Sequence, residues 1–321
     1  MSSPLISISV PVYNAERYLR QCLDSLVRQT LRDIEIVVVN DGSTDSSESI
    51  IREYAERDSR IVLICKENGG LASARQAALE AAHGLYFCAC DADDWVEPDM
   101  YEKLYRKAVE TNADIVMCDY WSEYPNGKQV ASCYGKEPMQ QDDLLDDALN
   151  GLFPPQVWSK IFKRSLFSRL SLSWEPGINL GEDFLLMLKI LRYRISIAYL
   201  PISLYHYRRE LGGSTYTNSI TMETLNQSLF IRQWVMSHVA IEKYSNGLFR
   251  LWLNFGFTAL RVKDGMTGRF YREEILCHVP YYGFLTYRYP ILKGGLVLSA
   301  KLLGYRFSKF IYEKVYKYVY H

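Results

Sequence analysis

The sequence predicts an α/β fold: a doubly wound, mostly parallel sheet followed by a helical C-terminal extension. In about the first 90 residues, four short apolar runs alternate with stretches of helical spacing, as in a parallel sheet whose strands are joined by helices. The run at residues 34–39 is almost entirely apolar, as expected of a strand covered on both faces. From about residue 220 the apolar spacing is helical and strand signals are few.

The first four strands and the helices between them follow one another in order. The expected strands are residues 5–12, 34–39, 60–65 and 85–90. The expected helices are residues 15–28, a segment that ends near residue 57, and residues 71–82. Ser43 or Thr44 is expected to cap the second helix. The right-handed crossover rule then fixes the sense in which the sheet is wound.

The regular alternation ends at about residue 98. Beyond it, the expected elements are a helix at 99–111, a strand at 114–119, a short acidic helix at 142–149 and a strand at 196–207. Residues 121–140 contain a Pro-Asn-Gly turn sequence and are expected to form an exposed loop. We expect the chain to divide into residues 1–215, which carry the sheet, and residues 216–321, which are helical.

The bulk composition excludes some classes of protein. The 37 Lys and Arg residues balance the 37 Asp and Glu residues, so no overall positive field favours a nucleic-acid partner. The seven cysteines include no CxxC pair, which favours free thiols in a reducing compartment over disulfides or a zinc site. The N-terminus lacks a basic and apolar signal segment, and no apolar run of about 18 residues occurs. We therefore expect a cytoplasmic protein.

The C-terminal segment combines tyrosines with positive charge. From residue 281 onward it holds nine of the 25 tyrosines, and from Arg288 onward it holds seven Lys and Arg residues against one acid. Helical spacing places six apolar side chains on one face: Leu303, Phe307, Phe310, Ile311, Val315 and Tyr318. The opposite face would carry Arg306, Lys309, Glu313 and Lys317. Such a helix can lie on an anionic membrane surface, and packing on the protein's own body or on a homodimer partner is the equally supported alternative.

Polar side chains follow three of the predicted strands at the point where each strand ends. The segments are Pro11–Glu16, Asn40–Asp45 and Asp91–Asp94. Ligands of an open parallel sheet bind beyond the carboxyl ends of its strands, so three such segments on one edge indicate a binding site.

Asp91-Ala92-Asp93 is the most informative of these segments. Two carboxylates one residue apart, at the end of a buried strand, repel each other unless a cation lies between them. Mg²⁺ and Mn²⁺ prefer oxygen ligands, and Mg²⁺ usually shares them with substrate phosphates. The sequence therefore predicts a divalent metal site at this edge.

Four sequence elements, in order and spacing, resemble the donor domain of the family 2 (inverting) glycosyltransferases with the GT-A fold. They are VPVYNAERYL, VVVNDGSTD, ENGGLASARQAAL and YFCACDADDWVEPD, all between Ile6 and about Tyr105. Further on, VWSKIFKRSLF and GINLGEDFLLML resemble the family's acceptor-side motifs. The resemblance implies a GT-A domain in residues 1–215, with a donor half at 1–110 and an acceptor half at 111–215.

The resemblance also implies a donor site. Its members would be Pro11, Tyr13, Glu16, Asp41, Arg75, Asp91 and Ala92, with Asp93 as the metal ligand. Asp41 would accept a hydrogen bond from the N3–H of uracil, because a carboxylate is a strong acceptor. Arg75 would lie against the nucleotide or a carboxylate of the site, and a surface position on its helix is the alternative. Asp91 would face the sugar or ribose, while Asp93 would bind the Mn²⁺ or Mg²⁺ that bridges the diphosphate.

By the same resemblance, Asp183 would be the catalytic base. An acceptor hydroxyl is a poor nucleophile until its proton is removed, and in-line attack inverts the anomeric carbon. The competing explanation for this segment is a capping box formed by Asn179 and Glu182, which accounts for Glu182 but not for Asp183. Glu182 and Trp158 are assigned to the acceptor site, which Lys160 could also line, with core packing as the alternative for Trp158.

The function predicted in this way is metal-dependent transfer of a sugar from a nucleotide diphosphate. The donor would be a UDP-hexose or UDP-N-acetylhexosamine, and the acceptor a glycan or lipid-linked glycan of surface polysaccharide or lipopolysaccharide synthesis. A protein of this kind could lie on the inner face of the cytoplasmic membrane. The alternative is a non-catalytic scaffold subunit that binds sugar nucleotides. A dinucleotide-dependent dehydrogenase is disfavoured, because no GxGxxG follows the first strand.

Overall fold

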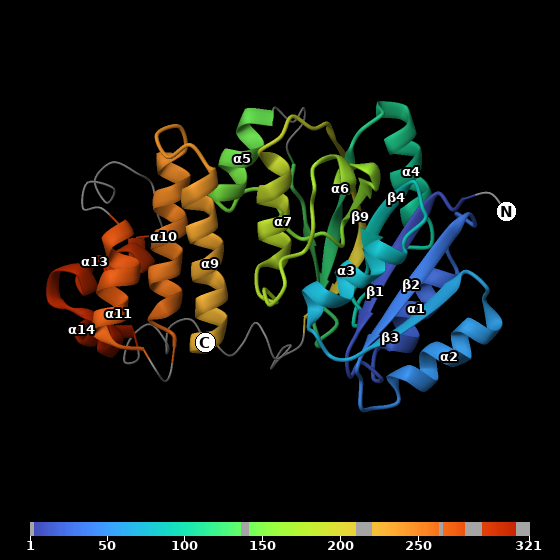
Figure 1. The fold of residues 1–321 in the computed structure, drawn as a ribbon, viewed down its shortest axis with the longest axis horizontal. Coiled ribbons are helices and arrows are strands. Elements are labelled where there is room, and N and C mark those ends of the chain that lie inside the picture. The colour runs from blue at the N-terminus through green and yellow to red at the C-terminus, as the bar shows by residue number, and fades with distance from the viewer. Residues whose placement is uncertain (1–2, 136–140, 210–219, 263–265, 280–290, 313–321) are drawn as a thin grey trace. The chain divides into compact units, whose positions relative to one another are not determined.

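The structure is a computed structural model that describes residues 3–135, 141–209, 220–262, 266–279 and 291–312. The chain forms two compact units (Figure 1), which we call the sheet unit and the helical unit. The sheet unit comprises residues 1–141 and 155–213, and the helical unit comprises residues 142–154 and 214–321. The helical unit thus includes one short stretch from within the range expected for the first domain.

A mixed sheet of nine strands is the framework of the sheet unit. Its strands are β1 (Ile6–Val12), β2 (Ile34–Asp41), β3 (Ile61–Lys66), β4 (Tyr86–Ala89), β5 (Trp95–Val96), β6 (Ile115–Glu123), β7 (Gln129–Ser132), β8 (Lys160–Lys163) and β9 (Ile197–Arg208). Their order is β3-β2-β1-β4-β8-β6-β9-β5, and β7 pairs with β6 outside this path. The α/β fold predicted from the sequence is confirmed.

The first four strands form the parallel half of the sheet. β1 pairs in parallel with β2 on one side and with β4 on the other, and β3 pairs in parallel with β2. The other half is mixed, because β8 runs antiparallel to β4 and β6 whereas β9 runs parallel to β6. The carboxyl ends of β1, β2 and β4 therefore meet at one edge, where the polar segments of the sequence are brought together.

Helices cover both faces of the parallel half. α1 (Leu19–Val27), α2 (Ser47–Arg57) and α4 (Met100–Thr111) share a core with one face of β1, to which Ile6, Ile8 and Val10 belong. α3 (Leu71–Ala81) packs on β1 and β2. The cap expected for α2 was wrong: Ser46 is the N-cap, because Ser43 and Thr44 are bonded to Asn14 in the preceding loop.

The segment at residues 121–140 differs from the expected loop. β6 continues to Glu123, and Glu123 pairs with Gln129 of β7 in an antiparallel hairpin. The amide of Gly127, whose φ is +78°, donates to the Tyr124 carbonyl and closes the turn. The strand ladder thus extends beyond the turn signal, and residues 136–140 lie outside the described ranges.

Two further helices complete the sheet unit, and the rest belong mainly to the helical unit. α6 (Ser165–Arg169) and α7 (Glu182–Leu191) belong to the sheet unit. The helical unit is built from α5 (Gln141–Leu149), α9 (Met222–His238), α10 (Ser245–Ala259), α11 (Gly268–Phe270), the turns Tyr271–Ile275 and Leu276–His278, α13 (Ile291–Leu303) and α14 (Tyr305–Ile311). Its core is apolar and includes Trp252, Leu253 and Phe255. No helix in the described ranges is long and apolar enough to cross a membrane.

The amphipathic helix expected near the C-terminus is different in the structure. Gly304, with φ +94°, separates α13 from α14, so no single helix runs through this point. Lys309, expected on the polar face, donates instead to the carbonyl oxygens of Leu260 and Val262. Leu303 and Phe307 of the expected apolar face are 63% and 45% exposed, so they are not covered by the described part of the protein, and a membrane contact of this face stays a prediction. The other expected members, Glu313, Val315, Lys317 and Tyr318, lie outside the described residues.

Candidate active site

The loops after β1 and β2 are joined by side-chain hydrogen bonds. Asn14 Oδ1 accepts from the Thr44 amide at 2.8 Å, and the Asn14 amide donates to Ser43 Oγ at 3.1 Å. Glu16 Oε2 accepts from the amide of Ser46, the N-cap of α2, at 2.8 Å. Glu16 therefore fixes the start of α2, and its contact with a nucleoside stays a prediction.

The other predicted donor residues of these strand ends differ in exposure. Pro11 is buried within β1, whereas Tyr13, two residues later, is 54% exposed and accessible to a ligand. Ala92 is buried directly after β4. The structure thus brings Pro11 and Tyr13 to the same edge as Ala92, and their contacts with a donor stay predictions.

Asp41 organises the loop that leads into α3. Its Oδ1 accepts from Lys66 Nζ at 2.6 Å and from the Gly69 amide at 3.0 Å. Its Oδ2 accepts from the Gly70 amide at 2.8 Å. A carboxylate oxygen has two acceptor sites, so Oδ2 can still accept from the N–H of a base, as predicted.

Tyr205 and Arg208 of β9 fix the turn that follows β4. The Tyr205 hydroxyl accepts from the Asp91 amide at 3.1 Å and donates to Asp94 Oδ2 at 2.7 Å. Asp94 Oδ1 accepts from the Arg208 amide at 2.8 Å, and the Arg208 guanidinium donates to the Asp93 carbonyl at 2.7 Å. Asp94 is 1% exposed, and its contacts with β9 give it a structural role in holding this turn.

The carboxylate of Asp93 fits the role of a metal ligand. Burial and the neighbouring charge of Asp91 raise the pKa of Asp93 to about 6, so a positive partner here would be favourable. Within the described ranges, no group of three or more His, Cys, Asp or Glu side chains could hold a metal ion. A metal bound at Asp93 would therefore take further oxygen ligands from a bound diphosphate or from water.

Gly70 and Asn179 bring the start of α7 against the start of α3. Gly70 has φ +83°, and a Cβ added there would lie 2.4 Å from Asn179 Nδ2, so only glycine permits this approach. Asn179 Oδ1 accepts from the Ala72 amide of α3 at 3.2 Å. The capping box expected between Asn179 and Glu182 was wrong, because the N-cap of α7 is Gly181 and Asn179 is bonded to α3.

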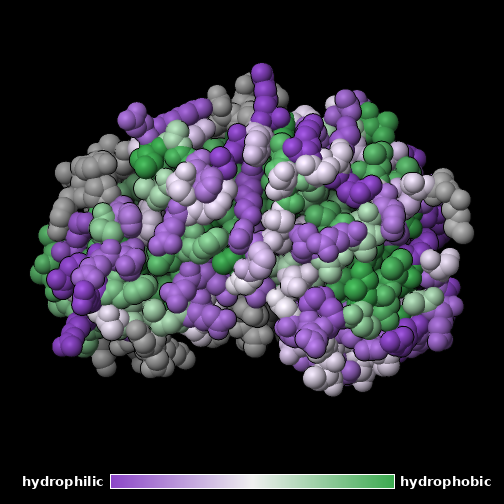
Figure 2. Space-filling view, in the orientation of Figure 1, coloured by the Kyte–Doolittle hydropathy of each residue, from purple (hydrophilic) through white to green (hydrophobic). Residues whose placement is uncertain are grey.

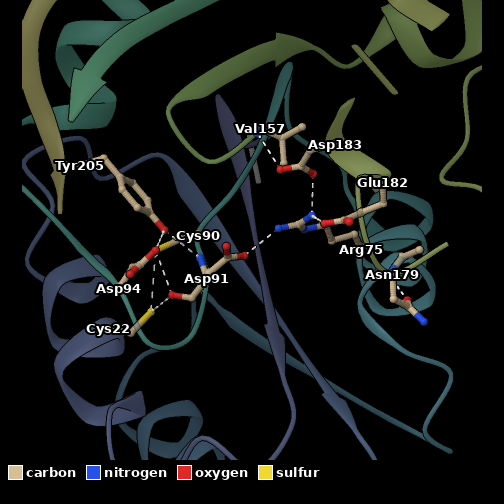
Figure 3. Close-up of polar contacts among 11 residues, drawn as sticks. Cys22, Arg75, Cys90, Asp91, Asp94, Val157, Asn179, Glu182, Asp183 and Tyr205 are labelled. Atoms are coloured by element: carbon tan, nitrogen blue, oxygen red, sulfur yellow. Dashed lines mark hydrogen bonds and ion pairs between the residues drawn. The ribbon is translucent and has the colours of Figure 1, made fainter. Parts of the chain in front are cut away.

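Arg75 is the centre of the site (Figure 3). Its guanidinium, which is 1% exposed, donates to Asp91 Oδ1 at 2.8 Å, to Glu182 Oε1 at 2.8 Å and to Asp183 Oδ1 at 2.6 Å. Arg75 comes from α3, Asp91 from the turn after β4, and the other two carboxylates from the first turn of α7. One buried cation therefore joins the predicted donor-side carboxylate to the predicted base, and the alternative surface position of Arg75 was wrong.

The charges in this cluster shift one another's protonation. Burial, together with the charge of Asp183, raises the pKa of Glu182 to about 8, so that Glu182 keeps its proton near neutral pH. Burial also raises the pKa of Asp183, and this rise is opposed chiefly by Arg75. Burial opposes the charge of Arg75, but the three carboxylates more than compensate and raise its pKa. The guanidinium of Arg75 is thus permanently charged. Among its partners, Glu182 holds a proton near neutral pH.

Trp158, predicted for the acceptor site, lies in the core of the sheet unit. It is 7% exposed and stacks on the rings of Tyr205 and Tyr207, with centroids 4.3 and 5.4 Å away. Core packing accounts for this side chain, and its contact with an acceptor stays a prediction.

Some residues of the site were not predicted from the sequence. Lys66 pairs with Asp41, and Tyr205 holds the turn after β4. Both residues belong to strands. Each places a polar group at a strand position that is partly or wholly buried, and this is the feature that could have identified them. That signal identifies a side chain that needs a partner, but it does not say which partner.

Comparison with known protein families identifies relatives of the sheet unit. A model of glycosyl transferase family 2 matches residues 7–170. The "Putative glycosyltransferase EpsH" of Bacillus subtilis (strain 168) is 38% identical over 220 residues, which cover 66% of this chain and 63% of that protein. "Glycosyltransferase GlyA" of Streptococcus pneumoniae serotype 4 is 39% identical over 228 residues, which cover 65% of this chain and 31% of that protein. The chain therefore spans less than two thirds of the length of these curated relatives.

Two solved structures share the fold. S. aureus TarS 1-349, solved in complex with UDP-GlcNAc, superposes with a TM-score of 0.74 at 19% identity, over 97% of this chain and 92% of that one. The mannosyltransferase PcManGT from Pyrobaculum calidifontis, solved with GDP-Man and Mn²⁺, gives a TM-score of 0.57 at 16% identity, over 97% and 87% of the two chains. The GT-A fold implied by the sequence is confirmed.

Proposed function

Because the chain belongs to glycosyl transferase family 2, we propose that it is an inverting glycosyltransferase that moves a sugar from a nucleotide diphosphate to a hydroxyl of a glycan acceptor. The donor is a UDP-hexose or a UDP-N-acetylhexosamine, which the complex of TarS with UDP-GlcNAc supports. The acceptor is a glycan or lipid-linked glycan of surface polysaccharide synthesis.

The Arg75 cluster is the observation that carries this proposal. It places Asp91, at the predicted sugar-binding turn, and Asp183, the predicted base, on one guanidinium. Donor sugar and acceptor hydroxyl have to meet between such groups for transfer to occur. This proximity supports placing the residues assigned to donor and acceptor in one site.

Asp183 is oriented for base catalysis by two donors. Its Oδ1 accepts from Arg75 at 2.6 Å, and its Oδ2 accepts from the Val157 amide at 3.1 Å. Each oxygen keeps a second acceptor site, which can take the hydrogen bond of an acceptor hydroxyl. As the hydroxyl oxygen attacks the anomeric carbon from the side opposite the UDP leaving group, Asp183 takes up its proton, and the configuration inverts.

Asp93 is the residue proposed to hold Mn²⁺ or Mg²⁺. The cation would offset the negative charge that develops on the departing diphosphate. The turn that carries Asp93 is held by Tyr205 and Arg208, so its backbone is positioned before a donor binds. The complex of PcManGT with Mn²⁺ supports a divalent metal in this fold.

A non-catalytic scaffold subunit is the second candidate, and the Arg75 cluster disfavours it. Three carboxylates packed around one buried guanidinium are costly to desolvate. A protein that only binds a sugar nucleotide does not need a buried, oriented base beside the donor site.

Calorimetric binding of UDP, GDP, CMP, dTDP and ATP, each with and without Mn²⁺, tests the donor and metal assignments. We expect tight binding of UDP that weakens about 100-fold or more when Mn²⁺ is omitted or Asp93 is changed to Asn. Asp99→Asn, which alters an exposed carboxylate at the start of α4, is the matched control and should bind UDP as the wild type does. Equal UDP affinity with and without Mn²⁺ would contradict the assignment of a metal to Asp93. If no nucleotide binds, the non-catalytic scaffold becomes the better hypothesis.

The helical unit supplies a candidate membrane contact. Apolar side chains that are 45–63% exposed surround the turn between α13 and α14: Leu302, Leu303, Phe307 and Phe310. Figure 2 shows apolar surface at the left edge, where Figure 1 places α14. The exposed Arg306 lies in the same turn, and the chain from Arg288 onward carries seven basic residues against one acid. This charge is complementary to anionic lipid headgroups, so we propose a peripheral contact with the inner face of the cytoplasmic membrane.

A further inference from the structure

A second buried cation, Lys160, lies close to the base. Lys160 is 0% exposed and is the first residue of β8. Burial lowers the pKa of Lys160 to about 7, and the charge of Asp183 opposes this fall. A buried ammonium is costly to desolvate, and neither donor binding nor the transfer step as proposed uses it.

One peptide group connects Lys160 to Asp183. Lys160 Nζ donates to the Gln156 carbonyl oxygen at 2.6 Å. The Val157 amide donates to Asp183 Oδ2 at 3.1 Å, as Figure 3 shows. That carbonyl and that amide belong to the same peptide unit, so the ammonium, the peptide and the carboxylate form a continuous chain of hydrogen bonds.

We propose that Lys160 is a positioning residue that holds and charges Asp183 through the Gln156–Val157 peptide group. The inference rests on the proposed role of Asp183 as base. Hydrogen bonds in a chain polarise one another, so the ammonium on the carbonyl strengthens the amide as a donor to the carboxylate. Asp183 is then fixed from two sides, at Oδ1 by the Arg75 guanidinium and at Oδ2 by this peptide.

Lys160 also completes the balance of charge around the base. The groups that face Asp183 are Arg75 on α3, Asp91 after β4, Glu182 on α7 and Lys160 on β8, while Cys118 on β6 also faces Lys160. The charges of Lys160 and Asp183 support each other, because each opposes the shift that burial imposes on the pKa of the other. Removing Lys160 would leave Asp183 in an environment that favours its neutral form, which cannot accept a proton.

The pH dependence of transfer in Lys160→Met tests the proposal. Methionine has nearly the same length and no charge, and Lys163→Met, on the same strand but bonded to Asn112 near the surface, is the matched control. We expect the acid limb of the kcat profile of K160M to move to higher pH by at least about half a unit and kcat to fall about 10-fold or more, with UDP affinity unchanged. K163M should keep the wild-type profile. An unshifted acid limb in folded, UDP-binding K160M would overturn the role of Lys160.

A spectroscopic readout separates this inference from the proposed function. In protein labelled with ¹⁵N-valine, the Val157 amide resonance should move in Asp183→Asn and in K160M, and should stay in place in K163M. If the Val157 amide resonance does not move in K160M, the connection through the peptide group is wrong, although Asp183 can still be the base. If D183N keeps full transfer activity, the base assignment fails first. Lys160→Arg, which keeps the charge, provides a second variant if K160M does not fold, and a shifted acid limb in folded K160R would also contradict the proposal.

Discussion

Arg75 of the sheet unit and Lys309 of the helical unit are cations with different kinds of partner. In the sheet unit, Arg75 is surrounded by three carboxylates from two separate segments, the turn after β4 and the first turn of α7. In the helical unit, Lys309 donates to the carbonyl oxygens of Leu260 and Val262, which end α10 and follow it. The first arrangement concentrates ionised groups beside a binding edge, whereas the second satisfies main-chain groups at a helix end.

Arg232 and Lys301 of the helical unit also donate to carbonyl oxygens, Arg232 within α9 and α10 and Lys301 at the turn Leu276–His278 and the residue after it. Arg232 donates to the Ser228 and Leu251 carbonyls, and burial lowers its pKa to about 9. Lys301 donates to the Leu276 and Val279 carbonyls. A cation on a carbonyl stabilises local structure, since helix ends leave such oxygens without partners. A cation shared by carboxylates also sets their protonation, which is what acid–base chemistry requires.

The comparison is tested most strongly by Asp183→Asn. We expect kcat to fall about 1,000-fold, because the amide cannot take up the hydroxyl proton. UDP affinity should change by less than about threefold, since the base lies on the acceptor side. Transfer is measured as UDP released from the sugar nucleotide that the wild type turns over, with Asp24→Asn on α1 as the control. Near-normal turnover in D183N would move the base elsewhere.

Arg75→Met and Lys309→Met compare the two kinds of paired cation directly. Removing Arg75 leaves carboxylates without a partner and should lower the free energy of unfolding by about 3–5 kcal/mol. Removing Lys309 leaves neutral carbonyls and should cost about 1–3 kcal/mol. Hydrogen exchange followed by mass spectrometry should show faster exchange mainly in the sheet unit for R75M and mainly in the helical unit for K309M. Equal decreases in the free energy of unfolding would mean that the two arrangements stabilise the protein to the same extent.

Glu182→Gln tests whether Glu182 is protonated in the folded protein. The pKa of Glu182 is raised to about 8, so the folded protein keeps a proton that the unfolded chain releases at its ordinary value near 4.5. Its contribution to stability is therefore present at low pH and is lost as pH rises toward 8. We expect the Tm of the wild type to fall by about 5 °C more than that of E182Q between pH 5 and pH 9. Parallel curves would show that Glu182 is ionised throughout.

The smallest expected effect concerns the exposed apolar side chains of the helical unit. Changing Leu303, Phe307 and Phe310 to Ser should reduce sedimentation with vesicles of anionic phosphatidylglycerol several-fold, because less apolar area enters the lipid. The matched control changes three exposed apolar residues of the sheet unit, Val62, Val109 and Ile202, to Ser. If wild-type protein does not sediment with these vesicles, analytical ultracentrifugation decides whether the same face joins two copies instead.

The sequence by itself determined the parallel half of the sheet and the edge where the site lies. Strands near residues 5–12, 34–39, 60–65 and 85–90 were predicted to within about two residues, because buried strands leave a local apolar pattern. The family was indicated by short motifs at strand ends, whose spacing along the chain is itself a property of the sequence. Near the C-terminus the same periodicity predicted one amphipathic helix, whereas Gly304 divides the described part of this segment into α13 and α14.

The tertiary structure alone decided which charges meet. Arg75 and Asp183 are 108 residues apart, and Asn179, for which a cap of its own helix was the alternative, is bonded to α3. Lys160 and Asp183 are joined by hydrogen bonds through the Gln156–Val157 peptide group. Local sequence records periodicity and turn preference, which act over a few residues. A buried charge takes its partner from whichever segment the crossovers of the sheet bring alongside, so that partner is fixed only once the strands have paired.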